Sequence, residues 1–321
     1  MDTALRPSTK SPIRTLLGFA VAFLLLYAIA VAIAERTVGR ADTETAFQKL
    51  LAARGQQVDW LVIGASHALP FEFGEVPERL EQETGQSMLV LAEIGAGPLY
   101  NRFIVEQALH DLEVKHLIYV IDSFAFASEE WNEDRLSDRG LLRKTPLRLS
   151  TAQILGGLVL RSGTDPRGLF DYLTGFSKLN PVDRFPTEGW KGAASFDRRF
   201  RPSRHAVSAR ISYLYPGGAP EPETVERNLN ILDRLYELAR AAEVDVTLVK
   251  PPVPRAFADS LPGEDVFDAA LLAWIGPREI EVVDLSDAMP DPEFYFDTDH
   301  LNRDGVALFY SDFLGPLIER R

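Results

Sequence analysis

Five short blocks of Val, Ile and Leu, each bounded by turn residues, constrain the fold of this chain most strongly. They lie at 60–63, 88–91, 116–121, 244–249 and 280–285. Their residues do not alternate between apolar and polar, which is typical of parallel strands buried on both faces of a sheet. Helical periodicity lies between the blocks, at 76–84, 99–112 and 223–243. The pattern predicts an α/β fold with a doubly wound, mainly parallel sheet in three layers, whose functional residues follow the carboxyl ends of the strands.

Charge and cysteine content exclude several classes of protein. The chain has 321 residues, a formal net charge of −13 and no cysteine. Nucleic acid is excluded as a partner, because phosphate recognition needs clustered Lys and Arg that an acidic chain lacks overall. The absence of cysteine excludes disulfide frameworks, thiolate nucleophiles, and zinc or iron–sulfur sites built on Cys.

An uncharged apolar run at 15–34 predicts a transmembrane helix. At about 1.5 Å per residue the run reaches roughly 30 Å, the thickness of the hydrocarbon core of a bilayer. Arg6, Lys10 and Arg14 precede it and Glu35 follows, which favours a cytoplasmic tail at 1–14 and export of the remainder. A cleaved signal peptide ending at 32–34, Ala-Ile-Ala, is the alternative, but its apolar core is usually about 7 to 15 residues. We therefore expect a single-pass protein of the inner (cytoplasmic) membrane, with its C-terminal domain in the periplasm or outside the cell.

The exported part divides into a connector and a folded domain. The connector at 35–57 carries Phe47, Leu50 and Leu51 at helical spacing, and the folded domain is expected at 58–321. Residues from about 128 to 222 lack the strand–helix alternation and predict an insertion, either a substrate-facing lid or a plain structural excursion. Its aromatic residues either stack on sugar rings or form its own core: Trp131, Trp190, Phe196, Phe200, Tyr213 and Tyr215. The insertion also has a basic cluster, which we expect either to contact an anionic polymer or lipid headgroups or to be a solvated face. Its members are Arg198, Arg199, Arg201 and Arg204.

A Gly-x-Ser turn ends the first predicted strand, in the sequence Val62-Ile63-Gly64-Ala65-Ser66-His67. A serine hydroxyl at this edge of the sheet can attack an electrophile, while amide groups at the helix start stabilise an oxyanion. Alternatively, Ser66 only caps the following helix.

An acidic block with one histidine precedes the last predicted helix, at 296–305, Phe-Asp-Thr-Asp-His-Leu-Asn-Arg-Asp-Gly. His300 could take the serine proton as a general base, with Asp297, three residues earlier, orienting the imidazole. The alternative is a surface histidine that pairs with Asp299.

Together these two blocks resemble the SGNH/GDSL hydrolase superfamily, which has an SGNH-like, flavodoxin-like fold. The resemblance covers roughly 58–321 and implies a triad of Ser66 as nucleophile, His300 and Asp297, with no cofactor and no metal. The segment from His300 to Gly305 is similar to the family's His-Leu-Asn-x-x-Gly form. A glycine after the second strand supplies an oxyanion-hole amide in the family, alongside the amide of the nucleophile; Gly95 and Gly97 are both candidates here.

One family block departs from the pattern. The family's third block, Gly-x-Asn-Asp, supplies an asparagine to the oxyanion hole, but this chain has Val-Ile-Asp-Ser-Phe at 120–124. An ionised Asp122 would repel an oxyanion, so Asp122 must point away, be protonated or act otherwise, and Ser123 is the alternative donor. We expect His67 and Asp122 to contact substrate. These departures resemble a membrane-anchored, exported branch similar to polysaccharide and cell-wall O-acyltransferases.

Three other readings stay open. An α/β-hydrolase would need Gly-x-Ser-x-Gly, whereas position 68 is alanine. A metal site could use four side chains: Asp297, Asp299, His300 and His67. A non-catalytic scaffold would bind glycan or a membrane acyltransferase. The favoured hypothesis is an acyl-ester hydrolase or O-acyltransferase that acts on an exported glycan or envelope polymer through an acyl-Ser66 intermediate. Its expected partners are the membrane, that acyl-ester or glycan substrate and, as a further candidate, a membrane-bound acyltransferase.

Overall fold

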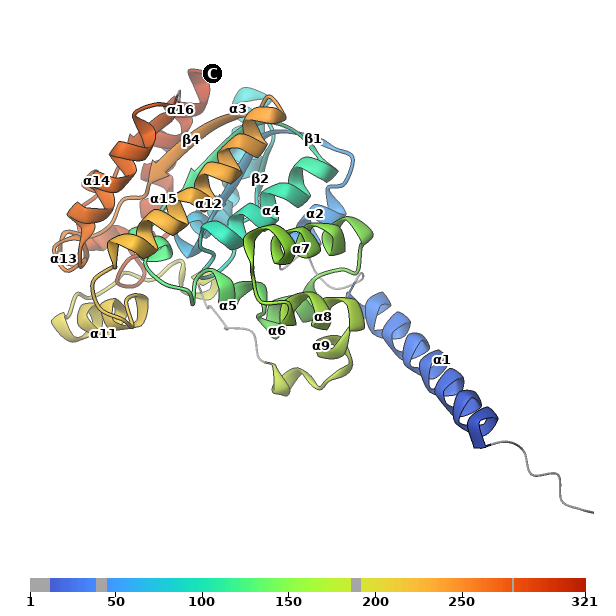
Figure 1. The fold of residues 1–321 in the computed structure, drawn as a ribbon. Helices are drawn as coiled ribbons and strands as arrows, with labels where there is room; N and C mark the ends of the chain where they lie inside the picture. Colours follow the sequence, from blue (N-terminus) through green and yellow to red (C-terminus); the bar gives the residue numbers. More distant parts are fainter. Residues whose placement is uncertain (1–11, 39–44, 186–191, 279) are drawn as a thin grey trace, which may run out of the picture.

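A five-stranded parallel sheet forms the centre of the molecule, in the order β2-β1-β3-β4-β5 (Figure 1). The computed structural model describes residues 12–38, 45–185, 192–278 and 280–321. The strands are β1 (Gln57–Gly64), β2 (Met88–Val90), β3 (Glu113–Val120), β4 (Asp245–Lys250) and β5 (Glu281–Asp284). All four pairings are parallel, so the five predicted strands and the doubly wound sheet are confirmed.

The register brings the carboxyl ends of the central strands to one edge of the sheet. Gly64 at the end of β1 lies opposite Val120 at the end of β3, and Val120 lies opposite Val249 near the end of β4. The residues that follow these strands therefore meet above the same edge, which is where a doubly wound sheet places its functional groups.

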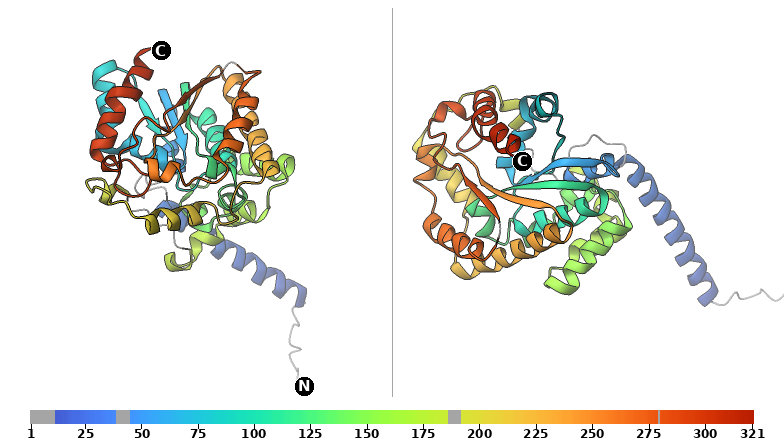
Figure 2. Two further views of the ribbon diagram at one scale, coloured as in Figure 1. Left: turned by 90° about the vertical axis from the view of Figure 1, so that its left-hand side faces the viewer. Right: turned by 90° about the horizontal axis from the view of Figure 1, so that it is seen from above.

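Helices cover both faces of the sheet and complete the three predicted layers (Figure 2). One face packs on α4 (Pro98–Asp111), α12 (Pro222–Ala241) and α14 (Glu264–Ile275), and the other on α3 (Val76–Thr84), α15 (Arg303–Phe309) and α16 (Gly315–Glu319). Successive residues of β1 alternate between the two cores: Leu61 and Ile63 belong to the first, Trp60 and Val62 to the second. The continuous apolar blocks are explained by this arrangement, because each strand must be apolar on both sides. A short helix α13 (Arg255–Ala258) follows β4, and a π turn at Tyr310–Leu314 joins α15 to α16.

A short amphipathic helix, α2 (Ala46–Ala52), lies where the connector was predicted to carry one. Thr45 caps it, and Phe47 and Leu50 are buried. The ring of Phe47 lies 4.4 Å from that of Phe103 on α4, centroid to centroid. The packed core therefore takes in residues that precede Val58.

The predicted insertion is a set of helices between β3 and α12. They are α5 (Glu133–Leu136), α6 (Arg139–Lys144), α7 (Leu149–Ser162), α8 (Arg167–Thr174), α9 (Phe176–Leu179), α10 (Gly192–Ser195) and α11 (Arg204–Leu214). Of its aromatic residues, Trp131, Phe196 and Tyr215 are buried, Phe200 is half-buried and Tyr213 is exposed. Trp190 lies outside the described residues. Core packing therefore accounts for three of these aromatic residues. The four arginines at 198, 199, 201 and 204 are exposed.

The N-terminal apolar run lies within one long helix, α1 (Pro12–Val38), which projects from the body (Figure 1). Among the described residues it is the one helix long and apolar enough to cross a membrane. Arg6 and Lys10 lie outside the described residues, as does 39–44 of the connector. The orientation across a membrane stays a prediction.

Candidate active site

The Gly-x-Ser turn is shaped by the close approach of β3 to the end of β1. Gly64 has φ of +150°, and a Cβ built on it would lie 2.8 Å from the carbonyl oxygen of Val120. Only glycine fits there without a shift of the backbone. Ser66 then begins the 3₁₀ helix η1 (Ser66–Glu75), whose N-cap is Ala65 without a side-chain cap. Capping by Ser66 is therefore wrong, and its hydroxyl is engaged elsewhere.

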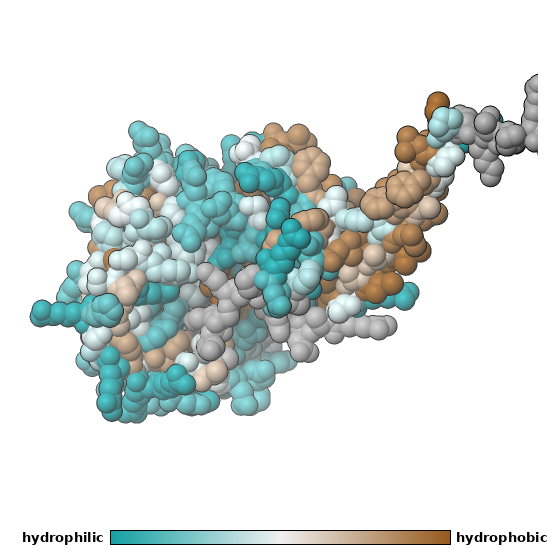
Figure 3. All heavy atoms as spheres, turned by 90° about the horizontal axis from the view of Figure 1, so that it is seen from below, coloured by the Kyte–Doolittle hydropathy of each residue, from teal (hydrophilic) through white to brown (hydrophobic). Residues whose placement is uncertain are grey.

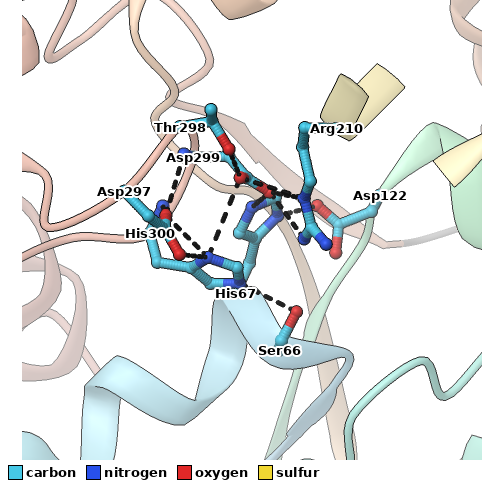
Figure 4. A network of polar contacts seen from close by, with 8 residues as sticks. All are labelled: Ser66, His67, Asp122, Arg210, Asp297, Thr298, Asp299 and His300. Atoms are coloured by element: carbon cyan, nitrogen blue, oxygen red, sulfur yellow. Dashed lines mark hydrogen bonds and ion pairs between the residues drawn. The ribbon is translucent and has the colours of Figure 1, made fainter. Parts of the chain in front are cut away.

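Ser66, His300 and Asp297 lie in one chain of hydrogen bonds (Figure 4). The Oγ of Ser66 is 2.9 Å from Nε2 of His300, and Nδ1 of His300 is 2.9 Å from both carboxylate oxygens of Asp297. An ionised carboxylate only accepts, so Nδ1 carries the proton and Nε2 accepts from the serine hydroxyl. This is the hydrogen-bond order of a serine-hydrolase triad.

The loop before α15 holds the imidazole in place. Oδ1 of Asp297 also accepts the backbone amides of Asp299 at 3.1 Å and His300 at 2.8 Å. Asn302 caps α15, because its Oδ1 accepts the amide of Gly305 at 2.9 Å. Its Nδ2 donates to the carbonyl of Glu293 at 2.7 Å. The His-Leu-Asn-x-x-Gly form thus has a local structural cause: it starts the helix and anchors the turn that carries His300.

Asp299 has a different role from Asp297. Its nearer oxygen is 3.8 Å from Nδ1 of His300, beyond hydrogen-bond distance. Asp299 is 1% exposed, and Arg210 of α11 donates to it from Nε at 2.9 Å and Nη2 at 2.7 Å. Thr298 Oγ1 lies 2.5 Å from Oδ1. The reading of His300 as a surface histidine paired with Asp299 is wrong, because His300 is 2% exposed and is bound by Asp297.

His67 is a buried cation between two carboxylates. Its Nδ1 lies 2.5 Å from Asp122 and its Nε2 lies 3.1 Å from Asp299. Burial opposes the charge, but Asp122 and then Asp299 raise the pKa of His67 to about 10. Burial likewise opposes ionisation of Asp299, yet His300, Arg210 and His67 hold the pKa of its carboxyl well below the usual range. Both groups are therefore charged at neutral pH.

Asp122, which stands where the family has asparagine, points its carboxylate at His67. Its Oδ1 is turned to His67, which compensates its charge. His67 and Asp122 are buried and bonded to each other, and both line a small cavity together with Ser123, so their contact with substrate stays a prediction. Ser123 Oγ lies 2.7 Å from the hydroxyl of Tyr215, which takes up one of its hydrogen-bonding directions.

The two candidate glycines differ in what their amides do. The amide of Gly97 donates to the carbonyl of Trp131 at 2.6 Å and is occupied. Gly95 has φ of +62°, and a Cβ there would lie 2.5 Å from the ring of Trp131. Within the described ranges, no backbone carbonyl accepts the amide of Gly95 or of Ser66. An oxyanion donor needs an amide of this kind, without an acceptor in the protein.

The geometry does not suit a metal ion. His67, Asp299 and His300 present ligand atoms within 4.8 Å of one another. Both nitrogens of His67 face carboxylates, and its pKa of about 10 keeps it protonated. Both nitrogens of His300 are engaged by Ser66 and Asp297. A protonated imidazole has no lone pair to offer, so binding a metal would require this network to rearrange.

Arg210 and Thr298 were not singled out from the sequence. Arg210 lies 89 positions before Asp299, in the insertion, and no local motif connects them. With these residues included, the cluster holds two side chains that are cationic at neutral pH, His67 and Arg210, and three carboxyl groups, Asp122, Asp297 and Asp299.

The parallel sheet, the Gly-x-Ser turn after β1 and the Asp-x-x-His block before the last helices agree with the arrangement that the resemblance implied. No known protein-family profile matches the chain. No curated protein sequence matches it either.

Solved structures similar to this chain include three bacterial proteins. A candidate acylhydrolase from Bacteroides fragilis has a TM-score of 0.46 and 10% identity, over 88% of this chain and 98% of its own. A GDSL-like lipase from Bacteroides thetaiotaomicron has a TM-score of 0.43 and 9% identity, over 82% and 88%. A candidate platelet activating factor from Streptococcus pneumonia has a TM-score of 0.39 and 10% identity, over 96% and 100%.

Proposed function

We propose that this chain is a serine-dependent acyl-ester hydrolase or O-acyltransferase, anchored by α1 in the inner membrane, that acts on an exported glycan or envelope polymer. The observation that carries the proposal is the hydrogen-bond chain from Ser66 through His300 to Asp297, with 2.9 Å at each step. Three residues from the two ends of the domain lie in the order that activates a serine hydroxyl.

The reaction follows from the groups in place. Ser66 Oγ attacks the ester carbonyl carbon while Nε2 of His300 takes its proton. The amides of Ser66 and Gly95 donate to the oxyanion of the tetrahedral intermediate. The intermediate collapses, and His300 returns the proton to the departing alcohol, leaving an acyl-Ser66 ester. Water or a sugar hydroxyl then attacks this ester, with His300 again as base, which releases a carboxylic acid or the acylated sugar and restores Ser66.

The surrounding charges favour His300 as the base. Asp297 accepts a hydrogen bond from Nδ1–H of His300 and stabilises the imidazolium that forms. The carboxylate of Asp299 lies 3.8 Å from the same nitrogen and adds to the electrostatic stabilisation of the imidazolium. His67 and Arg210 compensate the buried carboxylates Asp122 and Asp299, so the active site gains its transient cation without an excess of positive charge.

Replacing Ser66 by Ala tests the proposal directly. Turnover of a small acetyl ester by the full chain in detergent should fall at least about 10³-fold, because loss of the nucleophile leaves only the binding contribution. Ser311→Ala is the matched control, since Ser311 is exposed near the C-terminus. Equal turnover by Ser66→Ala and wild type would exclude Ser66 as nucleophile. A folded wild type without any turnover would favour the non-catalytic scaffold.

A second experiment identifies the molecule that accepts the acyl group from Ser66. Supplying the acetyl ester together with a soluble oligosaccharide partitions acyl-Ser66 between water and sugar hydroxyls. An acetylated oligosaccharide in the products would assign the transferase, whereas acetate alone at every sugar concentration would assign the hydrolase.

A further inference from the structure

The insertion touches the apolar helix α1 along its C-terminal half. The hydroxyl of Tyr27 donates to the carbonyl of Thr174 at 2.9 Å. Glu35 accepts from Nζ of Lys178 at 2.5 Å and from the amide of Leu147 at 2.6 Å. These contacts join α1 to the ends of α8 and α9 and to the chain before α7.

The contact is close and extends well into the apolar run. A Cβ on Gly175 would lie 3.1 Å from a methyl group of Val31, so the backbone between α8 and α9 lies directly on α1. Tyr27 and Glu35 are eight positions apart, which is about 12 Å along a helix. If α1 crosses a bilayer through 15–34, the α8–α9 turn lies beside its last turns and hence within the adjoining leaflet.

The surface of α8 and α9 around this contact is apolar and open. Phe170 is 62% exposed, Leu173 51% and Phe176 38%. On the opposite side of α8, Tyr172 is buried in the body, so this helix is amphipathic with its open apolar side chains away from the core. Figure 3 shows brown, apolar atoms that continue from α1 onto the adjoining body. Exposed large apolar side chains that adjoin a membrane span are typical of an interfacial segment.

Cationic and aromatic side chains lie together at the edge of this surface. The guanidinium of Arg139 lies 5.3 Å from the centre of the Phe176 ring and 5.2 Å from that of Phe185. The guanidinium of Arg184 lies 5.6 Å and 5.5 Å from the same two rings. Aromatic rings with arginines beside them are common at the level of lipid headgroups, where the ring is apolar and the cation meets phosphate.

We propose that α8 and α9 form a lipid-binding surface, which inserts Phe170, Leu173 and Phe176 into the leaflet beside α1 and fixes the orientation of the domain on the bilayer. The occupant of this surface is phospholipid. The inference rests on α1 being a membrane span but not on the esterase chemistry, so the two fail independently.

Single-cysteine labelling tests this surface cleanly, because the chain has no cysteine of its own. Leu173→Cys and Phe170→Cys probe the surface, Leu24→Cys marks the bilayer interior and Leu272→Cys, exposed on α14, marks water. Each full-length variant carries a nitroxide in vesicles of phosphatidylethanolamine and phosphatidylglycerol. Collision rates with oxygen and with a water-soluble nickel complex give the depth of each label, and thermal unfolding verifies that each variant is folded.

The labels at 173 and 170 should have an oxygen-to-nickel collision ratio at least about threefold above that of the 272 label, since interfacial side chains sit below the headgroups. A ratio equal to that of the 272 label, with the 24 label in lipid, would overturn the proposal and leave a membrane-protein partner as the occupant. Labels shielded from both reagents would show a second copy of the chain there, which also overturns it. A 24 label in water would refute the span and the surface together, whereas ester turnover, measured separately, is unaffected by any of these outcomes.

Discussion

Replacing Asp297 by Asn should slow ester turnover strongly while leaving the fold intact. The asparagine oxygen can still accept the amides of Asp299 and His300, which Oδ1 of Asp297 accepts at 3.1 Å and 2.8 Å. The loop should therefore keep its shape, with a loss of about 1 kcal/mol of stability or less. The change removes the negative charge opposite Nδ1 of His300 and allows the amide group to favour the wrong imidazole tautomer.

The size of the effect follows from the exposure of Asp297. In a fully buried triad the same change lowers kcat about 10⁴-fold. The Asp297 side chain is 39% exposed, so water screens part of its interaction with the imidazolium. We therefore expect kcat to fall about 10²- to 10³-fold, which corresponds to about 3 to 4 kcal/mol of transition-state stabilisation.

Steady-state hydrolysis of a chromogenic acetyl ester by the full chain in detergent measures this loss. Asp304→Asn is a matched control, because Asp304 is an exposed carboxylate nearby that pairs with Arg199 at 2.8 Å. A kcat for Asp297→Asn within about fivefold of wild type, with normal folding, would refute the reasoning. A larger loss for a folded Asp299→Asn variant would assign the orienting carboxylate to Asp299 instead.

Two further predictions concern the buried charges, and a third concerns a bound metal. Because the pKa of His67 is raised from 6.5 to about 10 on folding, its stabilisation is full below pH 6.5 and is lost as the pH rises to about 10. Chemical unfolding should show this decline in wild type and in His205→Gln, whose histidine is exposed on α11, but not in His67→Gln. A flat wild-type profile from pH 6.5 to about 10 would contradict it. Arg210→Ala should cost about 3 kcal/mol of unfolding free energy by leaving Asp299 short of a partner. Exposed Arg204→Ala on the same helix should cost little, and equal losses would argue against the buried pair. EDTA should leave ester turnover unchanged, and inactivation that zinc reverses would restore the metal reading.

The strands and the contact of Ser66 with His300 and Asp297 could be predicted from sequence because both have local signatures. A strand buried on two faces must be a continuous apolar block, and all five blocks became strands. The first half of the site is the turn at Gly64, where the missing side chain leaves room for β3. The second half is the turn shared by Asp297 and His300. Each half is therefore encoded within a few residues. Parallel strands with a common edge then bring the two halves together.

The rest of the site depends on contacts between distant segments. Arg210 reaches Asp299 from α11, and Asp122 meets His67 across neighbouring strand ends. No spacing rule connects these positions, so the sequence indicated an acidic residue in place of asparagine but not its partner. The packing of α2 on α4 and the contact of Tyr27 with Thr174 are likewise tertiary, and only the structure reveals them.

The most direct measurement of the central claim is the intact mass of the full chain after exposure to a serine-reactive fluorophosphonate. The account predicts one covalent adduct on wild type and none on Ser66→Ala, because only a hydroxyl bonded to a general base reacts readily. The absence of an adduct on folded wild type, or an adduct that persists on Ser66→Ala, would contradict the assignment of Ser66 as an activated nucleophile.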